Sequence, residues 1–150
     1  MSQFTSLERS VIVSAPLHVA YEAWNRFEEF PEFMEGVVAM ERLDEKRFVL
    51  KSESGGQVYE SICERVLTIP NRRLAWRTVE GPDSSGVVCF GETGSGQVEV
   101  TLKMRYNPKD GWQDEKEVTA RLERNLQRFK ARVESGAAHA KKGVRSAPAR

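Results

Sequence analysis

The chain has 150 residues, a length typical of a single domain, and a formal net charge of +1 at pH 7. Residues 136–150 contain four basic residues and no acidic one, so the remainder is slightly acidic. Because nucleic-acid-binding domains usually carry a strong basic surface, this balance argues against that function. No apolar run approaches the ~20 residues of a membrane-spanning helix, and none resembles a signal peptide. We therefore expect a cytoplasmic protein without a transmembrane segment.

The sequence predicts one strand, two short helices, six further strands and one long helix. The first strand ends before Pro16, which suits the first turn of a helix, and Pro31 interrupts the second helical segment. The six later strands are separated by short turns, so consecutive strands must pair antiparallel. The expected ranges are 8–14 for the first strand, 17–24 and 26–35 for the helical segments, and 37–43, 47–53, 57–69, 73–79, 87–92 and 97–106 for the six strands.

The last regular segment, Trp112 to Ser135, carries apolar residues at steps of three and four, which predicts a helix with one narrow apolar stripe. Asp114 and Glu117 form a capping pair near its start, and Gly136 suits its end. Such a helix must pack its stripe on another element. We therefore expect an α+β fold in which a curved seven-stranded antiparallel sheet grips the helix. The predicted organisation is a leader over 1–7, one domain over 8–135 and a disordered basic tail over 136–150.

Four runs carry a resemblance to a known family. They are APLHVAYEAWNRFEEFPEFMEGV at 15–37, PNRRLAWRTVEG at 70–81, SGVVCF at 85–90 and LERNLQRFKARVES at 122–135. Over about residues 8–135 the chain resembles the bacterial polyketide cyclase/dehydrase family of the START-like (SRPBCC) superfamily, which also contains coenzyme-Q-binding START-type domains. The resemblance implies a helix-grip fold with an apolar cavity between sheet and helix. It does not imply one particular reaction.

The residue types that hold metals or act as nucleophiles are sparse. Cys63 and Cys89 form no CxxC pair, so we expect two free thiols buried in strands. His18 and His139 have neither zinc-ligand nor catalytic-triad spacing, which indicates surface histidines. The sequence thus predicts no metal site and no cofactor.

The run GETGSG at 91–96 opens like a phosphate-binding loop. Gln97 and Val98 stand where Lys and Ser or Thr should follow, and a strand begins where a helix is needed. We interpret this run as a hairpin turn.

The aromatic residues suit a cavity for a flat or long apolar ligand. In the strand 57–69 two faces compete, and we favour the face with Tyr59, Ser61, Cys63, Arg65 and Leu67 as the inward one. An inward Arg65 would need an anionic or carbonyl partner; the alternative is an arginine at the sheet rim. The candidate ligand-binding residues are Trp24, Phe27, Arg65, Trp76, Phe90, Tyr106, Leu122 and Phe129.

Three functions stay open. The first is binding of a small hydrophobic molecule, such as a polyketide, quinone or lipid. The second, suggested by the family name, is a cyclase or dehydrase in which Arg65 and Tyr106 steer the carbonyls of a poly-β-keto chain. The third is docking on an anionic surface, for example transiently on a membrane, through the basic tail and a stripe of Arg121, Arg124, Arg128 and Arg132. Ordinary solvation of that helix flank is the alternative. The oligomeric state is not predicted.

Overall fold

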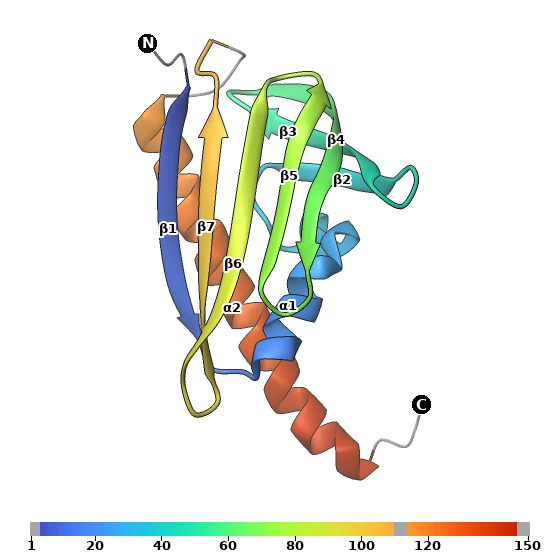
Figure 1. The fold of residues 1–150 in the computed structure, drawn as a ribbon, viewed down its shortest axis with the longest axis vertical. Helices are drawn as coiled ribbons and strands as arrows, with labels where there is room; N and C mark the ends of the chain where they lie inside the picture. The colour runs from blue at the N-terminus through green and yellow to red at the C-terminus, as the bar shows by residue number, and fades with distance from the viewer. Residues whose placement is uncertain (1–3, 110–113, 147–150) are drawn as a thin grey trace.

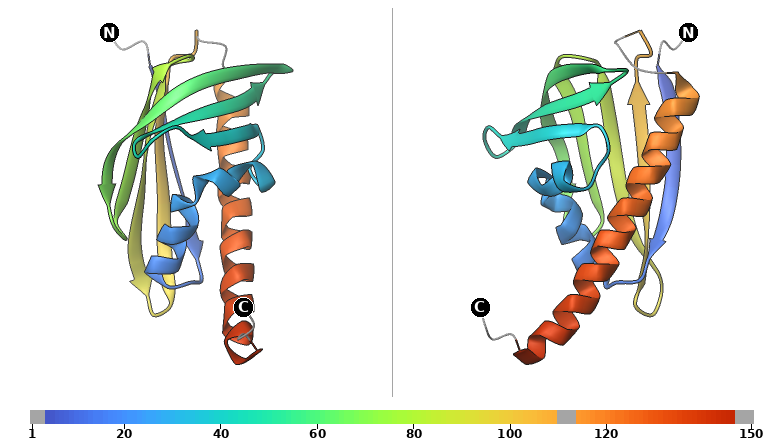
Figure 2. Two further views of the ribbon diagram at one scale, coloured as in Figure 1. Left: turned by 90° about the vertical axis from the view of Figure 1, so that its right-hand side faces the viewer. Right: turned by 180° about the vertical axis from the view of Figure 1, so that it is seen from behind.

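Seven strands form one antiparallel sheet in the spatial order β1-β7-β6-β5-β4-β3-β2, in a computed structural model that describes residues 4–109 and 114–146. The sheet curves, and α2 crosses its concave side together with α1 and η1 (Figure 1, Figure 2). This is the helix-grip fold that the sequence predicts. The elements are β1 (Thr5–Val13), α1 (Leu17–Asn25), the 3-10 helix η1 (Phe27–Glu32), β2 (Val37–Arg42), β3 (Arg47–Ser54), β4 (Gln57–Ile69), β5 (Arg73–Glu80), β6 (Ser84–Gly94), β7 (Gln97–Tyr106) and α2 (Glu115–Ser146).

Local chemistry explains where the short helices start and stop. Pro16 precedes α1 in extended conformation, and its carbonyl accepts hydrogen bonds from the N–H groups of Val19 and Ala20. Pro31 lies inside η1, where it cannot donate a backbone hydrogen bond, and this segment forms a 3-10 helix rather than an α-helix. Gly36 then turns the chain into β2 with a left-handed φ of 86°.

Two strands, β1 and β6, begin at earlier residues than the sequence predicts. β1 begins at Thr5, so the predicted leader is wrong from that residue on, and Leu7 belongs to the core. The reason is pairing with β7, which runs from Thr5 opposite Tyr106 to Val13 opposite Val98. Likewise, β6 begins at Ser84 because its first residues pair with the end of β7.

The long helix also differs from its predicted range. Trp112 lies outside the described residues, and α2 begins at Glu115, with the Asp114 side chain accepting a hydrogen bond from the Glu117 N–H at 3.0 Å, as the capping pair predicts. The helix does not stop at Gly136 but continues to Ser146. Gly136 lacks a left-handed φ, and the alanines that follow it favour helix. The backbone of 136–146 is therefore helical rather than disordered, whereas 147–150 lie outside the described residues.

The core lies between the concave face of the sheet and the apolar stripe of α2. Along β7, Val98, Val100, Leu102 and Tyr106 are buried while the alternate residues face solvent, as their pattern predicts. The helix contributes buried Leu122, Leu126, Phe129 and Val133. Burying one such side chain stabilises the fold by roughly 1.5–3 kcal/mol, so this stripe is a main reason that α2 stays on the sheet.

Candidate functional site

A cavity of about 250 Å3 lies between α2, the strands β2–β5 and the segment that joins η1 to β2. Most of its wall is apolar, and polar side chains enter it in two places. The lining residues are Trp24, Phe27, Phe30, Met34, Glu35, Gly36, Val37, Met40, Phe48, Leu50, Ser52, Glu53, Ser54, Arg65, Leu74, Ala75, Trp76, Leu102, Met104, Val118, Arg121, Leu122, Asn125 and Leu126.

One wall of the cavity depends on a missing side chain. Trp76 on β5 pairs directly with Gly86 on β6, so both residues face the same side of the sheet. The indole of Trp76 lies so close to Gly86 that a Cβ at this position would collide with the ring. Gly86 therefore sets the orientation of an aromatic cavity residue without lining the cavity itself.

Arg65 is the polar group on the β4 side of the cavity. The inward face that we favour is confirmed: Ser61 and Cys63 are buried, and Arg65 lines the cavity. The Arg65 Nη1 donates a hydrogen bond to Asn25 Oδ1 at 2.7 Å, and its guanidinium carbon lies 5.3 Å from the centre of the Phe27 ring. Asn25 is thus the carbonyl partner that an inward arginine requires.

In the described part of the chain, the positive charge of Arg65 is not balanced by a neighbouring carboxylate. No carboxylate forms an ion pair with it among the described residues. Burial lowers the pKa of Arg65, and the neighbouring positive charge of Arg42 lowers it further. A hydrogen-bond acceptor oxygen at the guanidinium would offset part of this cost, because it favours the charged form.

The predicted face of β4 does not continue to its end. Leu67 is 37% exposed although it shares the sequence parity of Arg65. The pairing of β4 with β5 shifts between Arg65 and Leu67, which is the signature of a bulge. Because a one-residue shift exchanges the two faces of a strand, Leu67 turns outward.

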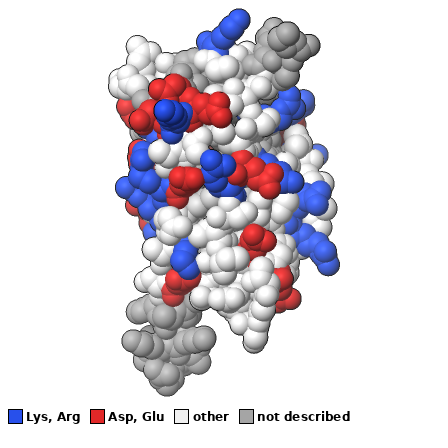
Figure 3. Space-filling view, turned by 90° about the vertical axis from the view of Figure 1, so that its left-hand side faces the viewer, with Lys and Arg blue, Asp and Glu red and all other residues white. Residues whose placement is uncertain are grey.

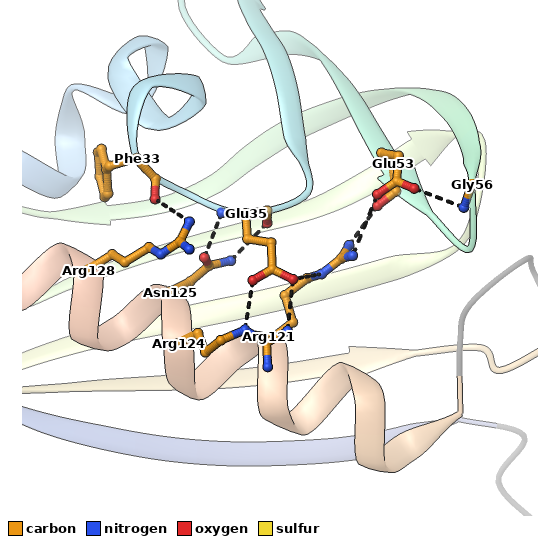
Figure 4. A network of polar contacts seen from close by, with 8 residues as sticks. All are labelled: Phe33, Glu35, Glu53, Gly56, Arg121, Arg124, Asn125 and Arg128. Atoms are coloured by element: carbon orange, nitrogen blue, oxygen red, sulfur yellow. Dashed lines mark hydrogen bonds and ion pairs between the residues drawn. The ribbon is translucent and has the colours of Figure 1, made fainter.

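A second polar cluster lies between α2, the η1–β2 connection and the β3–β4 hairpin (Figure 4). The Glu35 carboxylate accepts two hydrogen bonds from Arg124, at 2.7 and 2.8 Å, and lies 3.5 Å from the Arg121 Nε. The hydrogen bond from Arg124 lowers the pKa of Glu35 to about 2, with the charges of Arg124 and Arg121 acting in the same direction against its partial burial. Glu35 is therefore ionised at neutral pH.

The arginines of the α2 stripe form hydrogen bonds and ion pairs with other elements of the chain, so the stripe is not simply a solvated flank of the helix. Besides Arg121 and Arg124, Arg128 donates to the Phe33 carbonyl at 3.4 Å, and Arg132 contacts Glu29 and Glu32 at 3.0 and 2.9 Å. Glu29, Glu32 and Glu35 are partners in these contacts, whereas Glu28 pairs with Arg42 at 3.0 Å. On the side of the molecule shown in Figure 3, acidic and basic side chains lie interspersed rather than segregated.

The structure brings five of the predicted binding residues to the cavity wall: Trp24, Phe27, Arg65, Trp76 and Leu122. Phe90, Tyr106 and Phe129 are instead packed in the core, with exposed fractions of 7%, 1% and 0%.

Arg65 and Tyr106 do not form a pair in this site. Across the sheet, Arg65 is opposite Trp76, Trp76 opposite Gly86 and Gly86 opposite Met104, so Met104 occupies the place on β7 that the cavity reaches. Burial raises the pKa of the Tyr106 phenol. Tyr106 is thus a core residue.

Sequence reasoning missed several residues of the site. Gly86 and Ala75 carry no chemical signal, since small residues in strands have many roles. Asn125 stands next to the apolar stripe of α2 at a spacing of four from both Arg121 and Phe129, and this position could have indicated an inward polar group. Glu35 was indistinguishable from its acidic neighbours in sequence.

The remaining reactive residue types lie apart from any cluster. Burial raises the pKa of the Cys63 thiol to about 11, which disfavours the thiolate needed of a nucleophile. Cys89 is also a free thiol but is only half-buried, and His18 is exposed as expected, while the His139 side chain lies outside the described part. Among the described residues, His, Cys, Asp and Glu form no group of three that could hold a metal ion. No described helix has the length and apolar composition needed to cross a membrane.

Comparison with known proteins identifies a matching family and a related protein. A family model described as "polyketide cyclase / dehydrase and lipid transport" matches residues 13–134. An uncharacterized 17.2 kDa protein of Streptomyces lincolnensis is 34% identical over 105 residues, which cover 69% of this chain and 70% of that protein.

Solved structures show the same fold. A START superfamily protein from Mycobacterium smegmatis superposes with a TM-score of 0.70 at 12% identity, covering 90% of this chain and 98% of that one. The Zhui aromatase/cyclase from Streptomyces sp. R1128 has a TM-score of 0.64 at 19% identity, covering 96% and 98%. The chain belongs to the polyketide cyclase/dehydrase and lipid transport family.

Proposed function

We propose that the protein binds a small hydrophobic molecule in the cavity between its sheet and α2. The observation that supports this most strongly is the cavity itself, with aromatic and aliphatic side chains over most of its wall. Its volume of about 250 Å3 is slightly below the roughly 300–1,000 Å3 of typical ligand pockets, so the ligand should be small. An apolar body with one acceptor oxygen would place that oxygen at Arg65.

Ligand holding is better supported than catalysis. Catalysis of carbonyl chemistry usually needs two or three polar groups that converge on one reacting centre. In the described part of the cavity, Arg65 has Asn25 beside it, whereas Tyr106 is buried in the core. The second polar cluster is largely paired within itself. A carrier or binding role fits this wall.

The test uses N-phenyl-1-naphthylamine, an uncharged apolar dye whose fluorescence rises when it leaves water. Val37 lines the cavity on β2 and pairs with Ser52, which also lines it, so Val37→Phe should fill the space and weaken dye binding at least about ten-fold, equivalent to about 1.4 kcal/mol. Val38→Phe is the matched control, because Val38 is the next residue on the same strand, is 50% exposed and does not line the cavity. Equal dye affinity in both variants and the unaltered protein would contradict binding in this cavity.

A further inference from the structure

The wall of the cavity changes character where the chain passes from η1 to β2. We call residues 33–36 the strap. Met34, Glu35 and Gly36 of the strap line the cavity, and the strap lies across from the first turns of α2 (Figure 4). Elsewhere the wall is built from paired strands, the apolar stripe of α2 and aromatic residues of α1 and η1. At the strap, side-chain hydrogen bonds and ion pairs hold the wall together.

Asn125 fastens the backbone of the strap to α2. Its Oδ1 accepts a hydrogen bond from the Glu35 N–H at 2.7 Å, and its Nδ2 donates to the Glu35 carbonyl at 3.1 Å. One side chain thus satisfies both backbone groups of a residue, as a neighbouring strand would in a sheet. The Glu35 carboxylate adds the bidentate contact with Arg124 on the same helix.

Arg121 connects this contact to the β3–β4 hairpin. Its Nη1 donates to the Glu53 carbonyl at 2.6 Å, and its Nη2 lies 3.6 Å from the Glu53 carboxylate. The Glu53 N–H in turn donates to the Gly36 carbonyl at 2.8 Å. Gly36 leaves room for the Arg121 guanidinium, which a Cβ at this position would meet. Strap, helix and hairpin therefore meet at Arg121.

The contacts of the strap are weaker than the backbone hydrogen bonds between strands, so the strap is the part of the wall expected to open first. The Arg124 side chain is 47% exposed, that of Glu53 41% and that of Glu35 29%, so water and salt weaken their attraction. A strand in the sheet would have to break a whole ladder of backbone bonds to move. The strap is held to α2 and β3 by the side-chain contacts of Glu35, by the Arg128 contact with the Phe33 carbonyl and by the single Glu53–Gly36 backbone bond. Segments of low local stability are the ones that open most often.

We propose that the strap is the gate of the cavity, and that release of Glu35 from Arg121, Arg124 and Asn125 admits and discharges the ligand. This inference rests on the proposed ligand-binding function. In the closed state the cluster completes the wall, and in the open state the strap swings about Gly36 and exposes the apolar interior. Exchange of the ligand should therefore be limited by an electrostatic contact that the ligand itself does not need.

Stopped-flow fluorescence with N-phenyl-1-naphthylamine tests the gate. In Glu35→Gln, both the association and the dissociation rate should rise about five-fold or more, as expected for losing one partly exposed ion pair, while the equilibrium Kd changes much less. Salt between about 0.05 and 0.5 M should accelerate exchange in the unaltered protein but not in this variant, and the uncharged dye adds no salt effect of its own.

The control variant is Glu123→Gln. Glu123 lies on α2 and also pairs with an arginine, Arg9 of β1, at 2.7 Å, but it does not line the cavity. Its exchange rates should equal those of the unaltered protein. Rates in Glu35→Gln that match this control, while dye still binds, would overturn the gate and leave the binding function standing. An unaltered protein that takes up no dye would overturn both.

A second measurement needs no substitution. The Glu35 amide, which is bonded to Asn125, should exchange its hydrogen faster than the paired amides of β7, and saturating dye should slow it. Because this uses the unaltered protein, it holds even where a variant folds poorly. An amide at Glu35 that exchanges as slowly as those of β7 would contradict a gate at the strap.

Discussion

At the scale of single residues, Gly86 and Trp76 show how an absent atom shapes the site. Gly86 has no left-handed φ and no turn to make. What it supplies is room for the Trp76 indole, which forms part of the cavity wall. The glycine is therefore needed for packing rather than for backbone freedom.

We predict that Gly86→Ala displaces the Trp76 ring and destabilises the protein by about 1–3 kcal/mol, the usual cost of overpacking. Gly91→Ala is the matched control, since Gly91 lies on the same strand with no neighbouring atom within 4 Å of an added Cβ. Urea unfolding gives the free energy of unfolding of both. A Gly86→Ala protein as stable as the control would show that the indole moves aside without cost.

Glu35 provides a residue-scale prediction of pH dependence. Its pKa is about 2 in the folded protein, below the ordinary value of 4.5. A lowered pKa stabilises the fold fully above the ordinary value, and this contribution is lost as pH falls from 4.5 towards 2. Glu35→Gln should therefore be less stable than the unaltered protein near pH 6–7, and the difference should vanish near pH 2. Chemical unfolding at both pH values measures it; a difference that persists at low pH would mean that the carboxylate charge is not its cause.

At the scale of elements, α2 is held by two different kinds of contact. Its apolar stripe packs on the sheet, and its polar flank binds the strap and η1 through Asn125 and the arginines. The stripe was predictable from its period, because periodicity records which face is buried. The partners of the flank were not, because a charge pattern on one helix does not say which distant carboxylates meet it.

We predict that Asn125→Ala destabilises the protein by about 1–3 kcal/mol, because it leaves the backbone groups of Glu35 without their partners. Gln127→Ala on the exposed side of α2 should change stability by less than about 0.5 kcal/mol. Thermal unfolding of both variants provides the comparison. Equal losses in the two variants would indicate a general helix effect instead of the strap contact.

At the scale of the whole molecule, binding and stability should be linked. A ligand that binds only the folded state at a hundred times its Kd adds about 2.7 kcal/mol to the free energy of unfolding. Saturating N-phenyl-1-naphthylamine should thus raise the unfolding temperature of the unaltered protein and leave that of Val37→Phe unchanged. A rise of equal size in both would place the dye outside the cavity.

Much of the fold could be predicted from sequence, and much of the site could not. Strand order followed from short turns, and the inward face of Arg65 from the two competing patterns of β4. The outward position of Leu67 could not be predicted, because a bulge shifts the strand register. The core positions of Phe90 and Phe129 could not be predicted either, because an inward aromatic residue has the same sequence pattern whether it lines a cavity or fills a core. That choice depends on how the side chains pack together in three dimensions.

The pairing of β1 with β7 has a consequence for biosynthesis. Each of the strands β2 to β7 pairs with a strand that is adjacent in sequence. β1 instead pairs with β7, where Val11 lies opposite Val100, so β1 has no partner until β7 has been synthesised. A ribosome adds about 5–20 residues per second, so the partner of β1 is made roughly 5–20 s after β1 itself. Throughout that interval the nascent chain carries an apolar strand with an open edge, and α2, which covers the same layer, arrives later still. The protein can close its core only after β7 and α2 have been synthesised.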